Sequence, residues 1–340
     1  MNWKPAAIQL TSLMTRPFYA GLGSIYAFHR IIPESERSFL PVNRALEITT
    51  SDFEKLLTTI QQRGIDVIPL DAVPERLRHP ERRRFVVLTF DDGYRDNLTH
   101  ALPILRRFQM PFAIHVTTGF AGATAPLWWY SLESMLNQRG PWSFAWRNSS
   151  FESATHTPQD RERVFDQLAR IIRRSAPSES LDFFHALCET QKTDPLEATR
   201  ALTLRWSEMQ PLLDEPLCTL AAHGASHVPL RTLGNEALAA ELDDAKAAME
   251  SRLSRPVHHL AYPFGDATSI QSRECNAAAS AGFLTATTTR CGNLFPAHAN
   301  ALDRLPRVSI SGNYNATAMF HRFDSGLVQA LQSRRRVITL

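Results

Sequence analysis

The sequence predicts an α/β fold: a distorted (β/α) barrel that carries one helical insertion. Two observations predict it. Short apolar runs typical of buried strands recur along the chain, and helical patterns lie between these runs. Strands that alternate with helices indicate a mainly parallel sheet. Repetition of this unit over 340 residues suits a closed barrel better than an open sheet. We therefore expect one domain over residues 1–340, with the insertion at about 122–210.

Eight apolar segments are predicted to be the buried strands. In chain order they are Ser24 to Phe28, Asp66 to Pro69, Phe85 to Phe90, Phe112 to Val116, Thr219 to Ala222, His259 to Tyr262, Thr285 to Thr288 and Arg307 to Ile310. Helical patterns start at Ser51, where a capping residue precedes spaced apolar positions, and cover Asn235 to Leu253. Residues 122–210 show no clear strand and turn helical and charged, which indicates an insertion in the barrel and not a separate domain.

Composition and charge exclude several classes of protein. Apolar residues make up 44% of the chain and charged residues 21%, as in soluble globular proteins. The net charge of +3 is small and no lysine run alternates with aromatic residues, so we expect no nucleic-acid partner. No stretch approaches the ~18 consecutive apolar residues that suggest a membrane span. The four cysteines form no CxxC pair and are expected to be reduced thiols.

The N-terminal segment decides the expected location. It carries Lys4 and Arg16 but no unbroken apolar run of signal-peptide type, so a cytoplasmic enzyme is the simplest interpretation. The stretch from Ile8 to Tyr19 is weakly amphipathic. It fits either a peripheral membrane contact or, more simply, an ordinary packed helix.

The most informative motif is FVVLTFDDGY, residues 85–94. An apolar strand delivers Asp91 and Asp92 to its C-terminal end, which is where barrels place active sites, and Gly93 then turns the chain. Adjacent carboxylates are costly unless a cation separates their tasks, so that one binds a metal while the other takes a proton. A plain DDG turn between strand and helix is the alternative.

A second motif, TLAAHGASH, ends another apolar run. His223 and His227 are four residues apart, so on a helical turn both imidazoles would face one ion. Two histidines and one carboxylate make a mixed nitrogen and oxygen site for a divalent ion, with positions left open for water and substrate.

A third motif, YPFG, lies at a further strand end. Pro263 and Gly265 force a shaped turn there. Such a turn can aim backbone N–H groups at a developing oxyanion, although a purely structural turn is the alternative.

The order TFDDG, HxxxH, YPFG resembles the polysaccharide deacetylase family, which includes the NodB chitooligosaccharide deacetylases. Further segments resemble parts of that family: Phe28-His29-Arg30, Leu127-Trp128-Trp129, Thr287 to Phe295 and Leu305-Pro306-Arg307-Val308. The resemblance covers about residues 24–312.

The resemblance implies a distorted (β/α) barrel and hydrolysis of an N- or O-acetyl group on a sugar or oligosaccharide. It implies that Asp91 is the catalytic base, that Asp92, His223 and His227 hold the metal, and that the backbone at Tyr262 occupies the oxyanion position. We expect zinc, with cobalt or nickel able to substitute. A deacylase of non-sugar C–N amide bonds and a catalytically silent sugar-binding homologue are the alternative functions.

The chain departs from the family pattern at two positions. Gly224 stands where Ser or Thr is usual, so a hydroxyl that could brace the loop is lost. Ala261 stands where an arginine often precedes the proline, and we expect Arg307, on a late strand, to pair with Asp91 instead. Asp303 and Arg304, just before that strand, are alternatives, as is an exposed arginine on a loop. The general acid is not evident. His298 and His321 are candidates, each with a surface or core histidine as the alternative.

Overall fold

The computed structural model describes residues 18–81, 83–137, 141–147 and 149–326, together with residues 328 and 331. Residues 8–17 of the predicted amphipathic stretch lie outside this range, so a membrane contact there stays a prediction. No helix in the described part of the chain has the length and apolar character needed to cross a membrane. All four cysteines are described, and no disulfide joins them.

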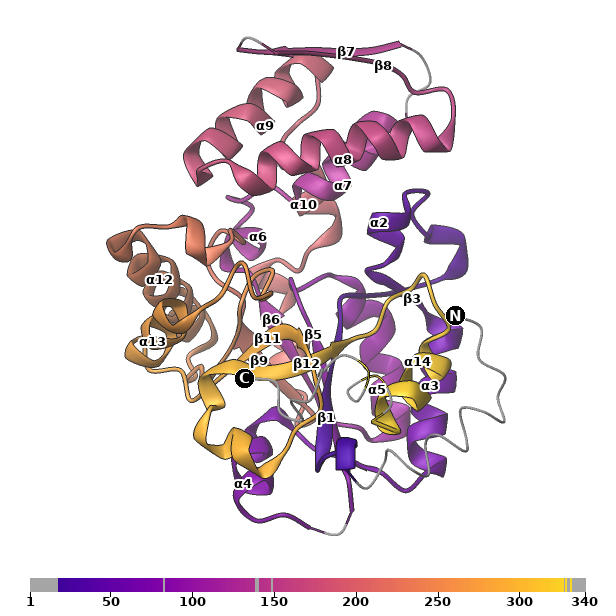
Figure 1. Ribbon diagram of the computed structural model, residues 1–340, viewed down its shortest axis with the longest axis vertical. Coiled ribbons are helices and arrows are strands. Elements are labelled where there is room, and N and C mark those ends of the chain that lie inside the picture. Colours follow the sequence, from indigo (N-terminus) through magenta and orange to yellow (C-terminus); the bar gives the residue numbers. More distant parts are fainter. Residues whose placement is uncertain are drawn as a thin grey trace.

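Seven parallel strands close a barrel, which confirms the predicted fold class (Figure 1). Around the ring they are β1 (Gly23–Phe28), β12 (Leu305–Ser309), β11 (Thr285–Cys291), β10 (His259–Ala261), β9 (Cys218–Ala222), β6 (Phe112–Val116) and β5 (Phe85–Phe90). The ring closes because β5 also pairs with β1 along all six residues. The two-residue β4 (Asp66–Val67) pairs beside the start of β5.

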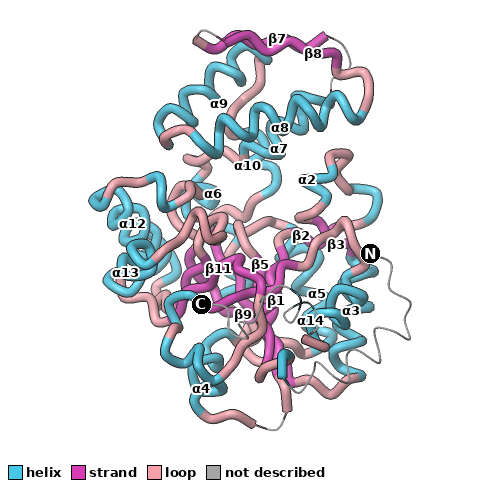
Figure 2. Tube along the Cα trace, in the orientation of Figure 1, coloured by secondary structure: helices cyan, strands magenta, loops and turns pink. Residues whose placement is uncertain are grey.

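The barrel lies inside a coat of helices (Figure 2). They are α3 (Thr50–Gln62), α4 (Val73–Arg78), α5 (Leu102–Phe108), α12 (Asn235–Leu253), α13 (Ser272–Ser280) and α14 (Ala316–Asp324). The coat forms because each long helix has an apolar stripe. In α12 the buried residues Leu238, Leu242, Ala245 and Met249 recur at helical spacing. At the start of α3, the Thr49 hydroxyl accepts a hydrogen bond from the Asp52 N–H.

Two short strands and a small helix follow β1. The strands are β2 (Arg30–Ile32) and β3 (Glu47–Thr49), which pair in parallel, and α2 (Pro41–Arg44) lies between them. Arg30 forms ion pairs with Asp96 and Glu47, with closest N–O distances of 2.7 and 3.3 Å. This buried pairing fixes the chain that leaves β1 at the upper end of the barrel.

The predicted insertion lies between β6 and β9, above the barrel in Figure 1. Its helices are α7 (Trp128–Leu136), α8 (Pro158–Arg174), α9 (Pro177–Gln191) and α10 (Glu197–Leu202). The short helix α6 (Thr118–Gly122) precedes it, and α11 (Gln210–Leu213) follows it and packs against β9. The expectation that it holds no strand is wrong, because β7 (Pro141–Trp146) and β8 (Ser149–Ala154) form an antiparallel hairpin. The period-two spacing of Trp142, Phe144 and Trp146 is the strand signal that its helical and charged surroundings obscured.

The insertion has its own aromatic core. That core also takes in Leu40 and Tyr94 from loops at the upper end of the barrel, and Phe120 from α6, so the insertion packs onto this end. The carboxyl ends of β5, β9 and β10 all lie at this upper end of the barrel. Asp91 follows β5, His223 follows β9 and Tyr262 follows β10, so the motifs meet there, as barrel geometry predicts.

Candidate active site

Asp92, His223 and His227 converge at the upper end of the barrel. Nε2 of His223 lies 3.3 Å from Oδ1 of Asp92, and Nε2 of His227 lies 3.1 Å from the same oxygen. One potential ligand atom from each residue lies within 4.8 Å of the other two. Oδ1 of Asp92 is buried and has no hydrogen-bond partner among the described residues. A buried carboxylate oxygen without a donor is costly, and a cation between the three groups would satisfy it.

A hydrogen bond at Nδ1 of His223 decides that Nε2 is the ring nitrogen that faces this cluster. Nδ1 lies 2.7 Å from the Ala261 carbonyl oxygen, which can only accept, so Nδ1 carries the proton and Nε2 offers its lone pair. Burial lowers the pKa of His223, but Asp91 and Asp92 outweigh burial and raise it above the ordinary value. The raised pKa favours a second proton, on Nε2, when no ion is bound. A divalent ion such as zinc would displace that proton and take the Nε2 lone pair beside the ionised carboxylate.

The backbone is strained where these ligands stand. Asp92 has φ +72° and His227 has φ +55°, a left-handed conformation that non-glycine residues seldom adopt. The expected helical turn between the two histidines is therefore wrong: residues 223–229 form a loop. Spacing alone could not distinguish a loop from a turn, because both bring the two rings to one ion.

Glu241 on α12 holds this loop in place. Its Oε1 accepts hydrogen bonds from the N–H groups of Ala225 and Ser226, at 2.8 and 2.7 Å, and its Oε2 accepts one from the Ser226 hydroxyl. Gly224 has φ +73°, and a Cβ there would lie 2.9 Å from Oε1 of Glu241. The glycine therefore fits a loop that Glu241 braces, so the hydroxyl missing at this position is replaced by a carboxylate.

Asp91 lies beside the cluster and is held by Arg307. The Arg307 guanidinium donates to both carboxylate oxygens, NH1 to Oδ1 at 2.7 Å and NH2 to Oδ2 at 2.6 Å. Its Nε donates to the Thr288 carbonyl at 3.0 Å. The expected pair is thus present and fully buried. Burial alone would raise the pKa of Asp91, but Arg307, then His223 and His115, hold it well below its ordinary value, so Asp91 is ionised.

A cavity of about 180 Å³ opens over these groups. Its polar lining includes His29, Asp91, Asp92, His223, His227 and Arg173. Its aromatic lining includes Trp128 and Trp129, which are only 7% and 6% exposed. Trp129 Nε1 donates to the Tyr94 hydroxyl at 3.0 Å, so this indole is held in the insertion's core.

The polysaccharide deacetylase model matches residues 78–286, more than half of the chain, and this range contains TFDDG, both histidines and YPFG. The chain belongs to the polysaccharide deacetylase family. No curated protein matches it significantly.

Solved structures agree on the fold. A Streptococcus pyogenes deacetylase in complex with acetate superposes with TM-score 0.52 at 17% identity, covering 88% of this chain and 96% of that one. A polysaccharide deacetylase from Bacillus cereus gives 0.56 at 14%, covering 89% and 68%. A de-N-acetylase from Aggregatibacter actinomycetemcomitans gives 0.55 at 12%, covering 88% and 99%. At such identities the likeness shows the fold alone.

Two site residues of this deacetylase-family chain come from outside the matched range. Arg307 lies in β12, and His29 follows β1 and is partly buried in the cavity wall. Sequence reasoning singled out Arg307 but named His29 only within a resembling segment, without a role. Its position after a barrel strand, like that of Asp91, was the available signal. Burial lowers the pKa of His29 below its ordinary value, against the opposing charges of Asp92 and Asp91.

His115 on β6 is a second residue that sequence reasoning missed. It is fully buried, and its Nδ1 lies 3.1 Å from Oδ1 of Asp91. Burial lowers the pKa of His115 to about 4, so the ring is neutral near pH 7. A histidine inside an apolar strand carries no spacing signal, which is why only the closed barrel places it beside Asp91.

The two histidines considered as general acids lie elsewhere. The ring of His298 is held by its own turn, where Nδ1 accepts from the Phe295 N–H at 2.9 Å. His321 lies on α14, which packs against α3. Neither residue lines the cavity over Asp91.

Tyr262 lines the cavity, but its polar groups are engaged. Its N–H donates to the Thr287 carbonyl at 3.0 Å, and its hydroxyl donates to the Asp303 carbonyl at 2.7 Å. Phe264, two residues on, has φ +62° and also lines the cavity. Its N–H donates no hydrogen bond within the described part of the chain. The YPFG turn therefore presents a free amide at Phe264, while the amide of Tyr262 belongs to the sheet.

Proposed function

We propose that this protein is a metal-dependent hydrolase that removes an acetyl group, an N-acetyl group first, from a carbohydrate in polysaccharide or envelope-glycan biosynthesis. The observation that carries the proposal is the buried cluster of Asp92, His223 and His227 beside an Asp91 that Arg307 holds ionised. A ligand set and a separate carboxylate base in one cavity are what hydrolysis of an unreactive amide needs.

Asp92, His223 and His227 would hold the ion through one carboxylate oxygen and two Nε2 atoms. Zinc suits this mixed nitrogen and oxygen set, and cobalt or nickel can replace it. When bound, the ion supplies Lewis acidity to the acetyl carbonyl and to water. The loop that Glu241 braces and the hydrogen bond from His223 to Ala261 keep two of the ligands oriented before any ion arrives.

Asp91 is proposed as the general base. Arg307 fixes both of its oxygens and holds its pKa low, so the carboxylate stays ionised and accepts the proton of the attacking water. The bond that forms joins the water oxygen to the acetyl carbon, and the bond that breaks joins that carbon to the sugar nitrogen. The leaving nitrogen needs a proton from a second group.

His29 is proposed as that second group. It lines the cavity that contains Asp91, and it lies outside the cluster that would hold the ion. A histidine opposite a carboxylate base gives the site one proton acceptor and one proton donor.

The Phe264 N–H is proposed as the backbone donor to the oxyanion, in place of Tyr262. An oxyanion donor must be free and preorganised, and the described contacts leave the Phe264 amide without an acceptor in a fixed turn. The side chain of Tyr262 would then act as part of the cavity wall.

A screen with two substrate classes tests the proposal. Zinc-loaded protein is incubated with N-acetylglucosamine oligomers and with acyclic N-acetyl amides, and acetate release is measured. We expect acetate from the oligomers. Release from the acyclic amides alone would favour a deacylase of non-sugar C–N bonds. Sugar binding without release from either class would favour a silent sugar-binding homologue. The proposed location is the cytoplasm, and no nucleic-acid partner is proposed.

A further inference from the structure

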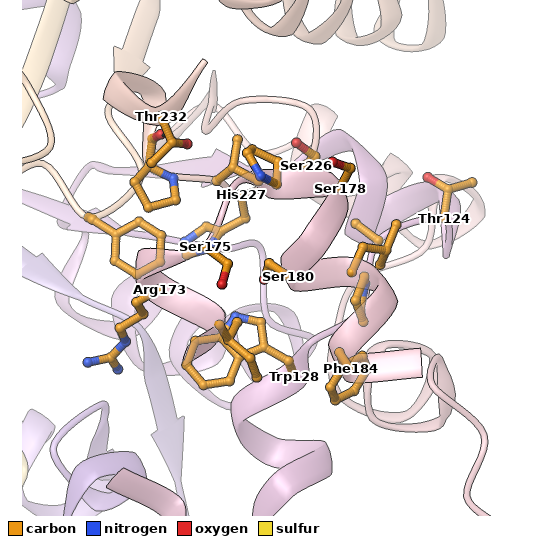
Figure 3. A pocket seen from close by; sticks show the side chains of 18 residues that line it. Thr124, Trp128, Arg173, Ser175, Ser178, Ser180, Phe184, Ser226, His227 and Thr232 are labelled. Carbon is orange, nitrogen blue, oxygen red and sulfur yellow. The ribbon is translucent and has the colours of Figure 1, made fainter. Parts of the chain in front are cut away.

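A second cavity, of about 280 Å³, is shown in Figure 3. It lies next to the one over Asp91. The insertion forms one wall, from the end of α8 to the start of α9. The loop after His223 forms the other wall, with His227 and Val228. The two cavities share four lining residues: Trp128, Arg173, His227 and Phe264. A molecule whose reacting group lies beside Asp91 could therefore extend past His227 into this space.

The lining of the second cavity is largely apolar. Ile172, Leu181 and Phe184 come from the insertion, and Val228 and Pro229 from the barrel loop. Serine and threonine hydroxyls also line the cavity, and none of its described lining residues is a carboxylate. Leu181 is 42% exposed, so its apolar side chain is accessible from this cavity. Such a surface binds an apolar chain more readily than a further sugar ring.

Arg173 stands at the junction of the two cavities. Figure 3 shows it on one side of the second cavity and Phe184 on the other, with Trp128 between them in this view. Its guanidinium carbon lies 5.4 Å from the centroid of the Trp128 ring. In the part of the chain that the structure describes, no carboxylate forms an ion pair with Arg173. Arg173 is exposed and lines both cavities, so its guanidinium, stacked on Trp128, is accessible to an anionic group of the substrate.

The order of these features along the groove restricts the substrate. The acetylated sugar belongs beside Asp91, an anion at Arg173, and an apolar chain beyond it. A phosphate linker, as a monophosphate or diphosphate diester, joins a sugar to a chain and keeps its charge, whereas a carboxylate joined on both sides is a neutral ester. We propose that the substrate is an acetylated sugar joined through phosphate to an apolar chain, with Arg173 on the phosphate and the chain in the second cavity. This inference rests on the proposed deacetylase function.

Binding tests the inference without turnover. Octyl phosphate and methyl phosphate are titrated calorimetrically into the zinc-loaded protein, below the concentration at which octyl phosphate forms micelles. We expect octyl phosphate to bind at least about tenfold more tightly, because several methylenes leave water. Arg173→Gln should weaken octyl phosphate about tenfold through loss of a charged contact, and Leu181→Asp should also weaken it. The controls are Arg174→Gln and Leu284→Asp, which change an exposed arginine and an exposed leucine outside both linings.

Equal affinity for the two phosphates would overturn the inference. So would an unchanged affinity in Arg173→Gln, which would mean that the phosphate binds elsewhere, including on the zinc. Tighter binding of uridine diphosphate than of octyl phosphate would identify a nucleotide-linked sugar and overturn it as well.

Turnover separates this inference from the proposed function. Wild-type protein could release acetate from N-acetylglucosamine oligomers but no faster from N-acetylglucosamine that carries an octyl phosphodiester. In that case only the inference fails. If the protein binds octyl phosphate through Arg173 and releases acetate from no sugar, the binding site stands and the deacetylase function fails.

Discussion

Arg307 on the last barrel strand donates two parallel hydrogen bonds to Asp91, although 216 positions separate the residues in sequence. Replacing Arg307 by Met removes both bonds and raises the pKa of Asp91. We expect kcat to fall about 10- to 100-fold, because each lost contact was made to a charged group.

The pH dependence of kcat/KM should shift in a definite direction when Arg307 is replaced. Arg307 lowers the pKa of Asp91, so without it the carboxylate protonates at higher pH, and the acid limb of kcat/KM should move upward. Arg304→Met is the matched control, because Arg304 pairs with Asp303 and not with Asp91. An unchanged acid limb in Arg307→Met would mean that Arg307 does not lower the pKa of the catalytic base.

Asp91→Asn should retain the ion and lose most activity. The amide is nearly isosteric but accepts no proton, and general base catalysis contributes ~10²–10⁴-fold. Because Arg307 then loses its anionic partner in a buried site, stability should fall too. Metal content and the urea unfolding curve, measured beside acetate release, separate the two effects. Turnover near that of wild type would mean that Asp91 is not the base.

His29→Gln should abolish the basic limb of the pH–rate profile. If His29 donates the proton to the leaving nitrogen, wild-type kcat/KM falls as rising pH deprotonates it, and the variant has no such group to titrate. The rate below that limb should fall about 10²-fold or more. His298→Gln and His321→Gln serve as comparisons, since neither residue lines the cavity. A basic limb that survives in His29→Gln would assign the acid role to another group.

The sequence predicted the chemistry of the site better than its surroundings. Asp91, Asp92 and His223 follow buried strands, and parallel strands end at one face of a barrel, so their convergence could be foreseen. Arg307 could be foreseen because the arginine usual at Ala261 is absent and an alternative was needed. The placing of His115 and His29 depends on which strands close the ring, and no local pattern carries that information.

Two local errors have physical causes. The spacing of His223 and His227 predicts a helical turn, because spacing alone cannot show a positive φ at His227. The resemblance indicates the Tyr262 backbone as the oxyanion donor, but its N–H bonds to Thr287, and that ladder bond depends on the register of β10 and β11. Both errors concern backbone conformation that tertiary contacts impose on the chain.

The lower end of the barrel supplies a stability prediction. A hydrogen bond from His259, at 2.9 Å, is the main cause that lowers the pKa of Asp71 to about 2. The folded pKa lies below the unfolded value, so the contribution is present above about pH 4 and is lost as pH falls through about 2. Asp71→Asn should reduce the free energy of unfolding by about 0.2–1 kcal/mol at pH 7, because the carboxylate is about half exposed.

Urea unfolding at several pH values checks this. The difference between wild type and Asp71→Asn should shrink from pH 5 toward pH 2.5. Asp243 is exposed and forms no hydrogen bond among the described residues. Asp243→Asn should therefore leave the free energy of unfolding unchanged at both pH 5 and pH 2.5. A constant difference across this range would show that Asp71 stabilises the fold through something other than its charge.

The most direct test of the account is a zinc titration of acetate release. Wild-type protein is stripped with a chelator, zinc is added back in steps, and release from an N-acetylglucosamine oligomer is followed beside the bound zinc. We expect activity to be lost on stripping and restored by one zinc per chain, whereas His227→Ala, with one of three ligands gone, should bind zinc far more weakly and regain little. Full activity in the stripped protein, or wild-type zinc affinity in His227→Ala, would contradict the account.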